Sequence, residues 1–113
     1  SIKLEARPLA HSRAGAFAIT PFALVDNDAS NRFTVIEVNA QDRPALLNEL
    51  AYALFESKVT VHSAHIATYG ERAVDTFYIT DLLGGKITSK QRLNGLQKRL
   101  TNAAERKTDK ETA

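Results

Sequence analysis

The 113-residue chain contains no cysteine, which excludes disulfide bonds and thiol chemistry. This composition fits a reducing compartment, and we expect a cytoplasmic location. No apolar run approaches the roughly 20 residues needed to span a bilayer, and the first residues have no signal-peptide pattern. The formal net charge is only +2, too small to indicate a nucleic-acid partner. The composition therefore predicts neither a membrane protein nor a nucleic-acid-binding one.

Groups of residues that would carry catalysis are also missing. Histidine is the usual metal ligand, but His62 and His65 are three apart on an expected strand, so they should face opposite sides of a sheet. Gly84-Gly85-Lys86 lacks the flanking residues of a phosphate-binding P-loop. The sequence also shows neither a pair of acids suited to acid–base catalysis nor a nucleophile next to a base. We therefore expect no catalytic residue, no metal site and no cofactor in this chain.

Length and composition predict one domain with a modest core, because 43% of the 113 residues are apolar. We expect a linker or the end of a preceding domain over 1–15, a folded domain over 16–105 and a charged, disordered tail over 106–113. The chain does not begin with methionine, which suggests a piece of a longer protein. Basic residues crowd the last quarter, and a solvated helix face explains them better than a phosphate-binding patch.

The first half of the expected domain is a β-hairpin followed by a helix. Residues 16–26 are predicted to be extended, with Pro21 best tolerated at a sheet edge. Turn-forming residues 27–31 lead into an alternating strand over 32–40. A helix should follow over 44–57. Its buried stripe is predicted from the i, i+3, i+4, i+7 spacing as Leu47, Leu50, Ala51 and Leu54.

The second half contains two more strands and a second helix. We expect strands over 59–69 and 72–83, joined by the tight turn Gly70-Glu71. A capping-box pattern, a hydroxyl at Thr88 and an amide at Gln91, starts a helix that ends near residue 104. The buried positions of this helix are predicted to be Leu93, Leu96, Leu100 and Ala103.

The strand over 32–40 runs through a short polar loop into the helix that starts at Pro44. Proline suits the first helical position because it has no N–H to leave unpaired. The peptide N–H groups just after it have no partner within the helix, and this end of a helix favours a carboxylate. A small anion such as an amino acid would fit here through backbone contacts, and a plain strand–loop–helix corner is the simpler alternative.

Two blocks of sequence resemble one family. Asp42-Arg43-Pro44-Ala45-Leu46-Leu47 resembles the Asp-Arg-Pro-Gly-Leu-Leu signature of ACT domains, which are small regulatory modules that bind amino acids. The longer block from His62 to Asp81 resembles the C-terminal ACT domain of bifunctional uridylyltransferase/uridylyl-removing enzymes. The resemblance covers residues 16–105. Ala45 departs from the usual glycine, which lets a ligand approach the backbone closely and tolerates positive φ.

The resemblance also implies a fold. ACT domains usually have the order β-α-β-β-α-β, with the last strand antiparallel beside the first. Here no strand is predicted after the second helix, and residues 16–26 would take that edge position. The implied fold is an α+β, ferredoxin-like ACT domain in permuted β-β-α-β-β-α order, with a four-stranded antiparallel sheet and two helices on one face. A three-stranded sheet with a loose N-terminal segment is the alternative.

In ACT domains a ligand usually sits between the loop after the first strand and the second strand of a neighbouring ACT domain. Carried over position by position, the resemblance implies these ligand-binding residues: Asn39, Gln41, Asp42 and Arg43 in the loop, the backbone of Ala45, Leu46 and Leu47, and Ser63, His65, Ile66 and Ala67 on the strand. Asp42 would accept from an ammonium group, and a local bond to the helix end is an equal alternative. Arg43 is expected to point to solvent.

The resemblance implies a regulatory, glutamine-sensing domain that controls uridylylation and deuridylylation of the PII signal protein in nitrogen regulation. The implied partners are glutamine, another ACT domain, and PII through a Mg-dependent parent enzyme, with no nucleic acid and no membrane. A ligand-free module for ACT pairing or protein interaction is the alternative, which Ala45 favours. An RNA-binding sheet is disfavoured because its basic-aromatic motif is missing.

Overall fold

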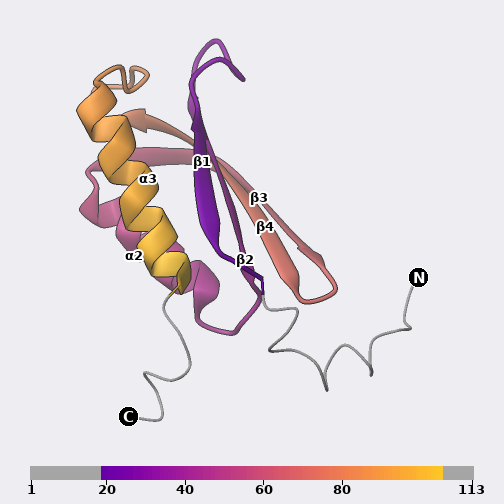
Figure 1. The fold of residues 1–113 in the computed structure, drawn as a ribbon. Coiled ribbons are helices and arrows are strands. Elements are labelled where there is room, and N and C mark those ends of the chain that lie inside the picture. Colours follow the sequence, from indigo (N-terminus) through magenta and orange to yellow (C-terminus); the bar gives the residue numbers. More distant parts are fainter. Residues whose placement is uncertain (1–18, 106–113) are drawn as a thin grey trace.

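Two helices pack on one face of a four-stranded antiparallel sheet (Figure 1). This computed structural model describes residues 19–105, so the linker expected over 1–15 and the tail expected over 106–113 lie outside the described residues. The elements in chain order are β1 (Phe22–Asp26), β2 (Thr34–Gln41), α2 (Leu46–Glu56), β3 (Val59–Tyr69), β4 (Arg72–Asp81) and α3 (Lys90–Glu105). This is the permuted β-β-α-β-β-α order that the sequence predicts.

The strands lie in the order β1-β2-β4-β3, and each neighbouring pair is antiparallel. Strand β1 pairs with β2 at the edge, where Phe22 lies opposite Asn39. Pro21 immediately precedes this edge strand, a position where its missing N–H costs no ladder hydrogen bond. The pairing of β1 excludes the three-stranded alternative and places the N-terminal strand where the resemblance predicts it.

The core lies between the sheet and the two helices. On β4 the buried side chains alternate, with Ala73, Phe77 and Ile79 facing the helices. Strand β2 contributes Ile36 and Val38 to the same layer. The opposite face of the sheet is not covered by either described helix (Figure 1).

Helix α2 starts later than expected and its buried stripe is rotated. It begins at Leu46, because Pro44 and Ala45 form a turn in which the Leu46 N–H donates to the Arg43 carbonyl at 3.1 Å. Leu46 is 2% exposed, whereas Leu47, predicted to be buried, is 44% exposed. Adjacent leucines satisfy the same helical spacing, so only packing against the sheet selects the inner one. The buried residues of α2 are Leu46, Leu50, Ala53 and Leu54.

Around the loop between β4 and α3, two predicted boundaries are wrong: the end of β4 and the start of α3. Strand β4 ends at Asp81 rather than at residue 83, because the Asp81 carboxylate accepts hydrogen bonds from the N–H groups of Leu83 and Gly85. Helix α3 is capped by Ser89, whose Oγ accepts from the Arg92 N–H at 3.2 Å, so the predicted cap at Thr88 is wrong by one residue. The buried residues of α3 are Leu96, Leu100, Ala103 and Ala104.

Strand β3 has an irregularity that the sequence pattern does not reveal. Its register against β4 shifts between Val61 and Ser63, so His62 is an extra, bulged residue. The His62 Nε2 lies 2.8 Å from the Thr80 Oγ1, and its ring lies 5.0 Å from that of Phe33. Because the bulge breaks the alternation, His62 and His65 both lie on the helix-free face. The expectation that they face opposite sides is therefore wrong.

Candidate functional site

The strand–loop–helix corner predicted from the sequence is the loop over 42–45 between β2 and α2. Hydrogen bonds hold it to the turn between β3 and β4. The Asp42 N–H donates to the Glu71 carbonyl at 2.8 Å, and the Gln41 Nε2 donates to the Glu71 Oε1 at 3.1 Å. These two bonds tie the loop after β2 to the turn between β3 and β4. A hollow of about 480 Å³ lies at this corner. It is lined by Asp42, Arg43, Pro44, Leu46 and Leu47.

The start of α2 carries no side-chain cap. Its N-cap residue is Ala45, and no side chain accepts a hydrogen bond there, so Asp42 does not have the local capping role that was the alternative to ligand binding. The Leu46 N–H is already used by the Arg43 carbonyl, which leaves Ala45 and Leu47 as the candidate amide donors of the corner. Ala45 has φ −91° and ψ −1°, so this position does not require glycine for its backbone conformation.

Arg43 points inward, contrary to expectation. Its side chain is 10% exposed, and its Nη2 lies 2.9 Å from the Glu49 Oε1. The same nitrogen donates to the Ala103 carbonyl at 3.1 Å. The guanidinium therefore joins the loop to both helices, a contact that depends on a residue 60 positions away in sequence.

The other predicted polar residues are divided between the two faces of the sheet. Asn39 is buried on the helix-free face, where its Nδ2 donates to the Glu37 Oε2 at 2.9 Å and its Oδ1 accepts from Arg72 at 3.5 Å. Gln41 lies on the same face and reaches Glu71. On β3, the register places Ser63, His65 and Ala67 on that face and Ile66 on the helix side. The structure thus brings Ile66, but not Asn39, to the side on which α2 begins.

Sequence reasoning missed Asp75, which lies on β4 between Val38 and Ile66 and faces the helices. It is 2% exposed, and its Oδ1 has no hydrogen-bond partner among the described residues. Burial raises the pKa of the Asp75 carboxyl, a hydrogen bond from the backbone of Ala67 lowers it, and the negative charge of Asp42 raises it. The sequence did contain a signal for it: Asp75 alternates with apolar residues on the side of this strand that faces the core.

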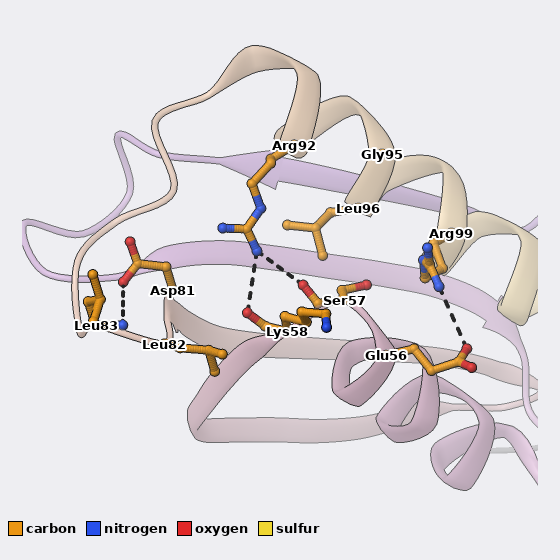
Figure 2. A pocket seen from close by; sticks show the side chains of 10 residues that line it. All are labelled: Glu56, Ser57, Lys58, Asp81, Leu82, Leu83, Arg92, Gly95, Leu96 and Arg99. Carbon is orange, nitrogen blue, oxygen red and sulfur yellow. Dashed lines mark hydrogen bonds and ion pairs between the residues drawn. The ribbon is translucent and has the colours of Figure 1, made fainter.

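A second hollow of about 500 Å³ lies between the end of α2, the loop after β4 and α3 (Figure 2). Arg92 crosses it and donates to the carbonyls of Ser57 and Lys58 at 3.0 and 3.3 Å (Figure 2). Arg99 lies 3.6 Å from the Glu56 carboxylate. Both guanidinium groups therefore hold α3 to the C-terminal end of α2. This hollow contains none of the predicted site residues.

Two features that would indicate other classes of protein, a membrane-spanning helix and a cluster of metal ligands, are absent from the described residues. None of the helices between residues 19 and 105 is long and apolar enough to cross a membrane. Within the same residues, no group of three or more histidine, cysteine, aspartate or glutamate side chains is arranged to hold a metal ion. Asp81, one of the two acids that line the second hollow, accepts hydrogen bonds from its own loop, and the N–H groups of Gly85, Leu83 and Gly84 lower the pKa of its carboxyl.

The permuted ferredoxin-like sheet and the strand–loop–helix corner define an ACT-type regulatory domain. A sequence profile described as the ACR family N-terminal ACT domain matches residues 29–107, and the chain belongs to this family.

Curated relatives are similar over nearly the whole chain. Three proteins named bifunctional uridylyltransferase/uridylyl-removing enzyme are 63%, 62% and 58% identical to it, from Novosphingobium aromaticivorans, Erythrobacter litoralis and Zymomonas mobilis subsp. mobilis. The matches cover 98%, 90% and 93% of this chain and 12%, 11% and 11% of the respective relatives. The chain thus spans about a tenth of the length of these relatives.

Proposed function

We propose that this chain is the glutamine-sensing domain of a bifunctional uridylyltransferase/uridylyl-removing enzyme. In that cytoplasmic, Mg-dependent parent, glutamine bound here inhibits uridylylation of PII and favours removal of the uridylyl group. The observation that carries the proposal is the uncapped start of α2, which follows a loop that the Asp42–Glu71 backbone bond ties to the turn between β3 and β4. The names of the relatives support the choice of parent enzyme.

The corner offers complementary groups to an amino acid. The amides at the start of α2 suit a carboxylate, because this end of a helix carries partial positive charge. The Asp42 carboxylate, exposed at the rim of the hollow, attracts an ammonium group. Control of the enzyme then follows by population shift, which requires glutamine to bind the two enzyme states with unequal affinity.

A second ACT domain is the proposed macromolecular partner. Strand β3 is at the edge of the sheet, and most of its residues are exposed, including Val61, Ile66 and Tyr69. An exposed edge strand presents unpaired N–H and C=O groups that pair readily with another strand. Pairing at β3 would place residues of a second ACT domain next to the corner and enclose the ligand.

Calorimetric titration of the 113-residue chain with glutamine tests the proposed function. Glutamate, asparagine and serine serve as controls for the side-chain amide and its distance from the backbone. We expect heat of binding only in the titration with glutamine. Glutamine should bind the Asp42→Ala variant at least tenfold more weakly than the wild-type chain. Equal binding of all four amino acids would contradict glutamine sensing. Absence of heat with every amino acid at millimolar concentration would contradict ligand binding by this chain.

The alternative is a module for pairing or protein interaction without a ligand. Its support is the outward side of α2, where Tyr52 and Phe55 are exposed, the latter at 76%. Ala45 in place of glycine adds a methyl group at the corner and also favours this alternative. Concentration-dependent association without any amino-acid binding would support it. Restoration of binding by Ala45→Gly would instead show that the corner is a ligand site blocked by one methyl group.

A further inference from the structure

The second hollow lies at the end of α2, and the corner lies at its start. Residues 56–58 line the second hollow together with the loop after β4 and part of α3 (Figure 2). Leu46 and Leu47, the first residues of α2, line the hollow at the corner. The helix has 11 residues, which span about 16 Å. One short helix therefore reaches both hollows.

Two arginines tie α2 and α3 together at these two places. Arg92, on α3, donates to the carbonyls of Ser57 and Lys58 just after the end of α2. Arg43, at the corner, donates to the Ala103 carbonyl near the end of α3. A sliding movement of α2 along α3 would strain both contacts, because each contact joins one helix to the other or to its flanking loop. The corner and the second hollow are therefore coupled through the same pair of helices.

The second hollow is lined by two adjacent exposed leucines in a hydrogen-bonded turn. Leu82 is 65% exposed and Leu83 is 97% exposed. The N–H groups of Leu83 and Gly85 donate to the Asp81 Oδ1, both at 2.9 Å. The Gly84 N–H donates to the Asp81 carbonyl at 3.1 Å. The turn thus holds both leucines out in solvent, and apolar side chains grouped beside a polar hollow are typical of a surface that binds a protein segment.

The charges around the second hollow favour an acidic segment. The described residues that line it include the cations Lys58, Arg92 and Arg99 and the acids Glu56 and Asp81. Both acids are engaged, since Asp81 accepts from its own loop and Glu56 lies 3.6 Å from Arg99. Within residues 19–105, the Lys58 ammonium group has no hydrogen bond or ion pair, and Arg92 uses only its Nη2. The unused donors suit carboxylates.

The backbone of Lys58 supports a role for its side chain. Its φ is 60°, in the left-handed region, where glycine or asparagine is usual after the end of a helix. Its charge is not needed to satisfy the end of α2, because Arg92 already binds the carbonyls of residues 57 and 58. The position therefore keeps an unfavourable residue whose ammonium group lines the hollow.

We propose that the second hollow is the docking surface for an acidic segment with apolar side chains, from a part of the parent enzyme outside this chain. The inference rests on the proposed function and adds the surface through which the domain controls the enzyme. This chain spans only about a tenth of the length of its relatives, so most of such an enzyme lies outside it. Carboxylates of the segment pair with the cations of the hollow, and its apolar side chains cover Leu82 and Leu83.

Hydroxyl-radical footprinting compares the full-length enzyme that contains this domain with the 113-residue chain, because covered side chains are oxidised slowly. We expect Leu83 to be oxidised at least fivefold more slowly in the full-length enzyme, and Leu24, exposed on β1, to be oxidised equally in both. Equal oxidation of Leu83 in the two proteins would overturn the inference. Protection of Leu83 in the 113-residue chain that grows with protein concentration would assign the surface to a second copy, and would overturn it too.

Two charge reversals on α3 test the chemistry of the segment. Arg99→Glu changes a residue that lines the hollow, whereas Lys98→Glu makes the same change at an exposed neighbour that does not line it. In the full-length enzyme, Arg99→Glu should raise the oxidation of Leu83 at least threefold, and Lys98→Glu should leave it unchanged. Equal effects of the two substitutions would overturn an acidic partner. Thermal unfolding confirms that each variant is folded, and Arg99→Gln replaces Arg99→Glu if that variant is not.

Regulation by glutamine separates this inference from the proposed function. In the 113-residue chain, Arg99→Glu should bind glutamine within twofold of wild type, because the corner is intact. In the full-length enzyme, the factor by which glutamine slows uridylylation should fall at least threefold in Arg99→Glu, because the docked segment and the ligand are coupled. Unchanged inhibition would overturn the inference and leave the proposed function intact. A wild-type enzyme that binds no glutamine would overturn the proposed function, whereas the footprint of Leu83 decides the docking independently.

Discussion

The Arg43 Nη2 lies 2.9 Å from the Glu49 Oε1, which joins the loop after β2 to the first turn of α2. The same nitrogen donates to the Ala103 carbonyl near the end of α3. Arg43 lies in the Asp42–Leu47 segment that resembles the ACT signature. Its side chain also links this loop to both helices, which fixes their position relative to the sheet. The main effect of these contacts is to stabilise the conformation of the loop before α2.

Replacement of Arg43 by alanine should lower the free energy of unfolding by about 2 kcal/mol, because a half-buried acid and a carbonyl lose a charged donor. Urea denaturation monitored by circular dichroism measures this loss. Arg99→Ala is the matched control: the Arg99–Glu56 pair is exposed and 3.6 Å apart, so its loss should cost less than about 1 kcal/mol. Equal effects of the two substitutions would show that the inward position of Arg43 adds no stability.

The rotation of α2 gives a second prediction from two adjacent leucines. Leu46→Ala should destabilise the fold by about 2–4 kcal/mol, because it leaves a cavity beneath the start of the helix. Leu47→Ala should change stability by no more than about 0.5 kcal/mol, because that side chain is half exposed. Denaturant unfolding of the two variants at the same pH compares them directly. A larger effect at Leu47 would support the buried stripe expected from the sequence instead.

Asp75 should make the free energy of unfolding fall as the pH rises, whereas an acid paired with a cation makes it rise. Burial raises the folded-state pKa of Asp75 above the unfolded value, so its penalty is absent below the unfolded value and grows as pH rises through the raised pKa. Asp75→Asn removes this penalty. The variant should therefore be more stable than wild type at neutral pH, and the difference should shrink as the pH falls towards the ordinary aspartate range. Urea unfolding across this pH interval measures the difference, and a variant less stable at neutral pH would contradict it.

Pairing through the edge of β3 should respond to charge on that strand. Val61→Lys places a charge beside the edge and should weaken self-association of the chain at least tenfold, because edge lysines oppose strand pairing. Sedimentation equilibrium over a range of protein concentrations measures the association. Leu24→Lys, an exposed position on β1 at the other edge, is the control and should leave the association unchanged. The reverse pattern would move the interface to β1.

Much of the fold follows from local patterns. The bounds of β3 are the predicted ones, and β4 starts where predicted, because alternating strands flank Gly70, whose φ of +64° suits glycine in a tight turn. The inward positions of Leu96 and Leu100 follow from the helical spacing of apolar residues. The order of the elements along the chain also came from the sequence, whereas the edge position of β1 beside β2 was implied by the resemblance to ACT domains.

The candidate site was predicted less completely, because its residues depend on partners far along the chain. Arg43 turns inward to reach Ala103, and Asp42 is positioned by Glu71, contacts that no local pattern encodes. The ligand role of the residues carried over from the resemblance remains a prediction. Asp75 was missed because periodicity locates a core position but does not tell whether the acid found there has a partner.

The sequence by itself determined the kinds of elements, their order and the family, since spacing, turn residues and motifs are local properties of the chain. Tertiary structure alone decided which of two adjacent leucines is buried, that His62 forms a bulge and that Asp75 is buried with an unpaired oxygen. These outcomes depend on packing between distant segments, where steric fit and the loss of solvent outweigh local preference.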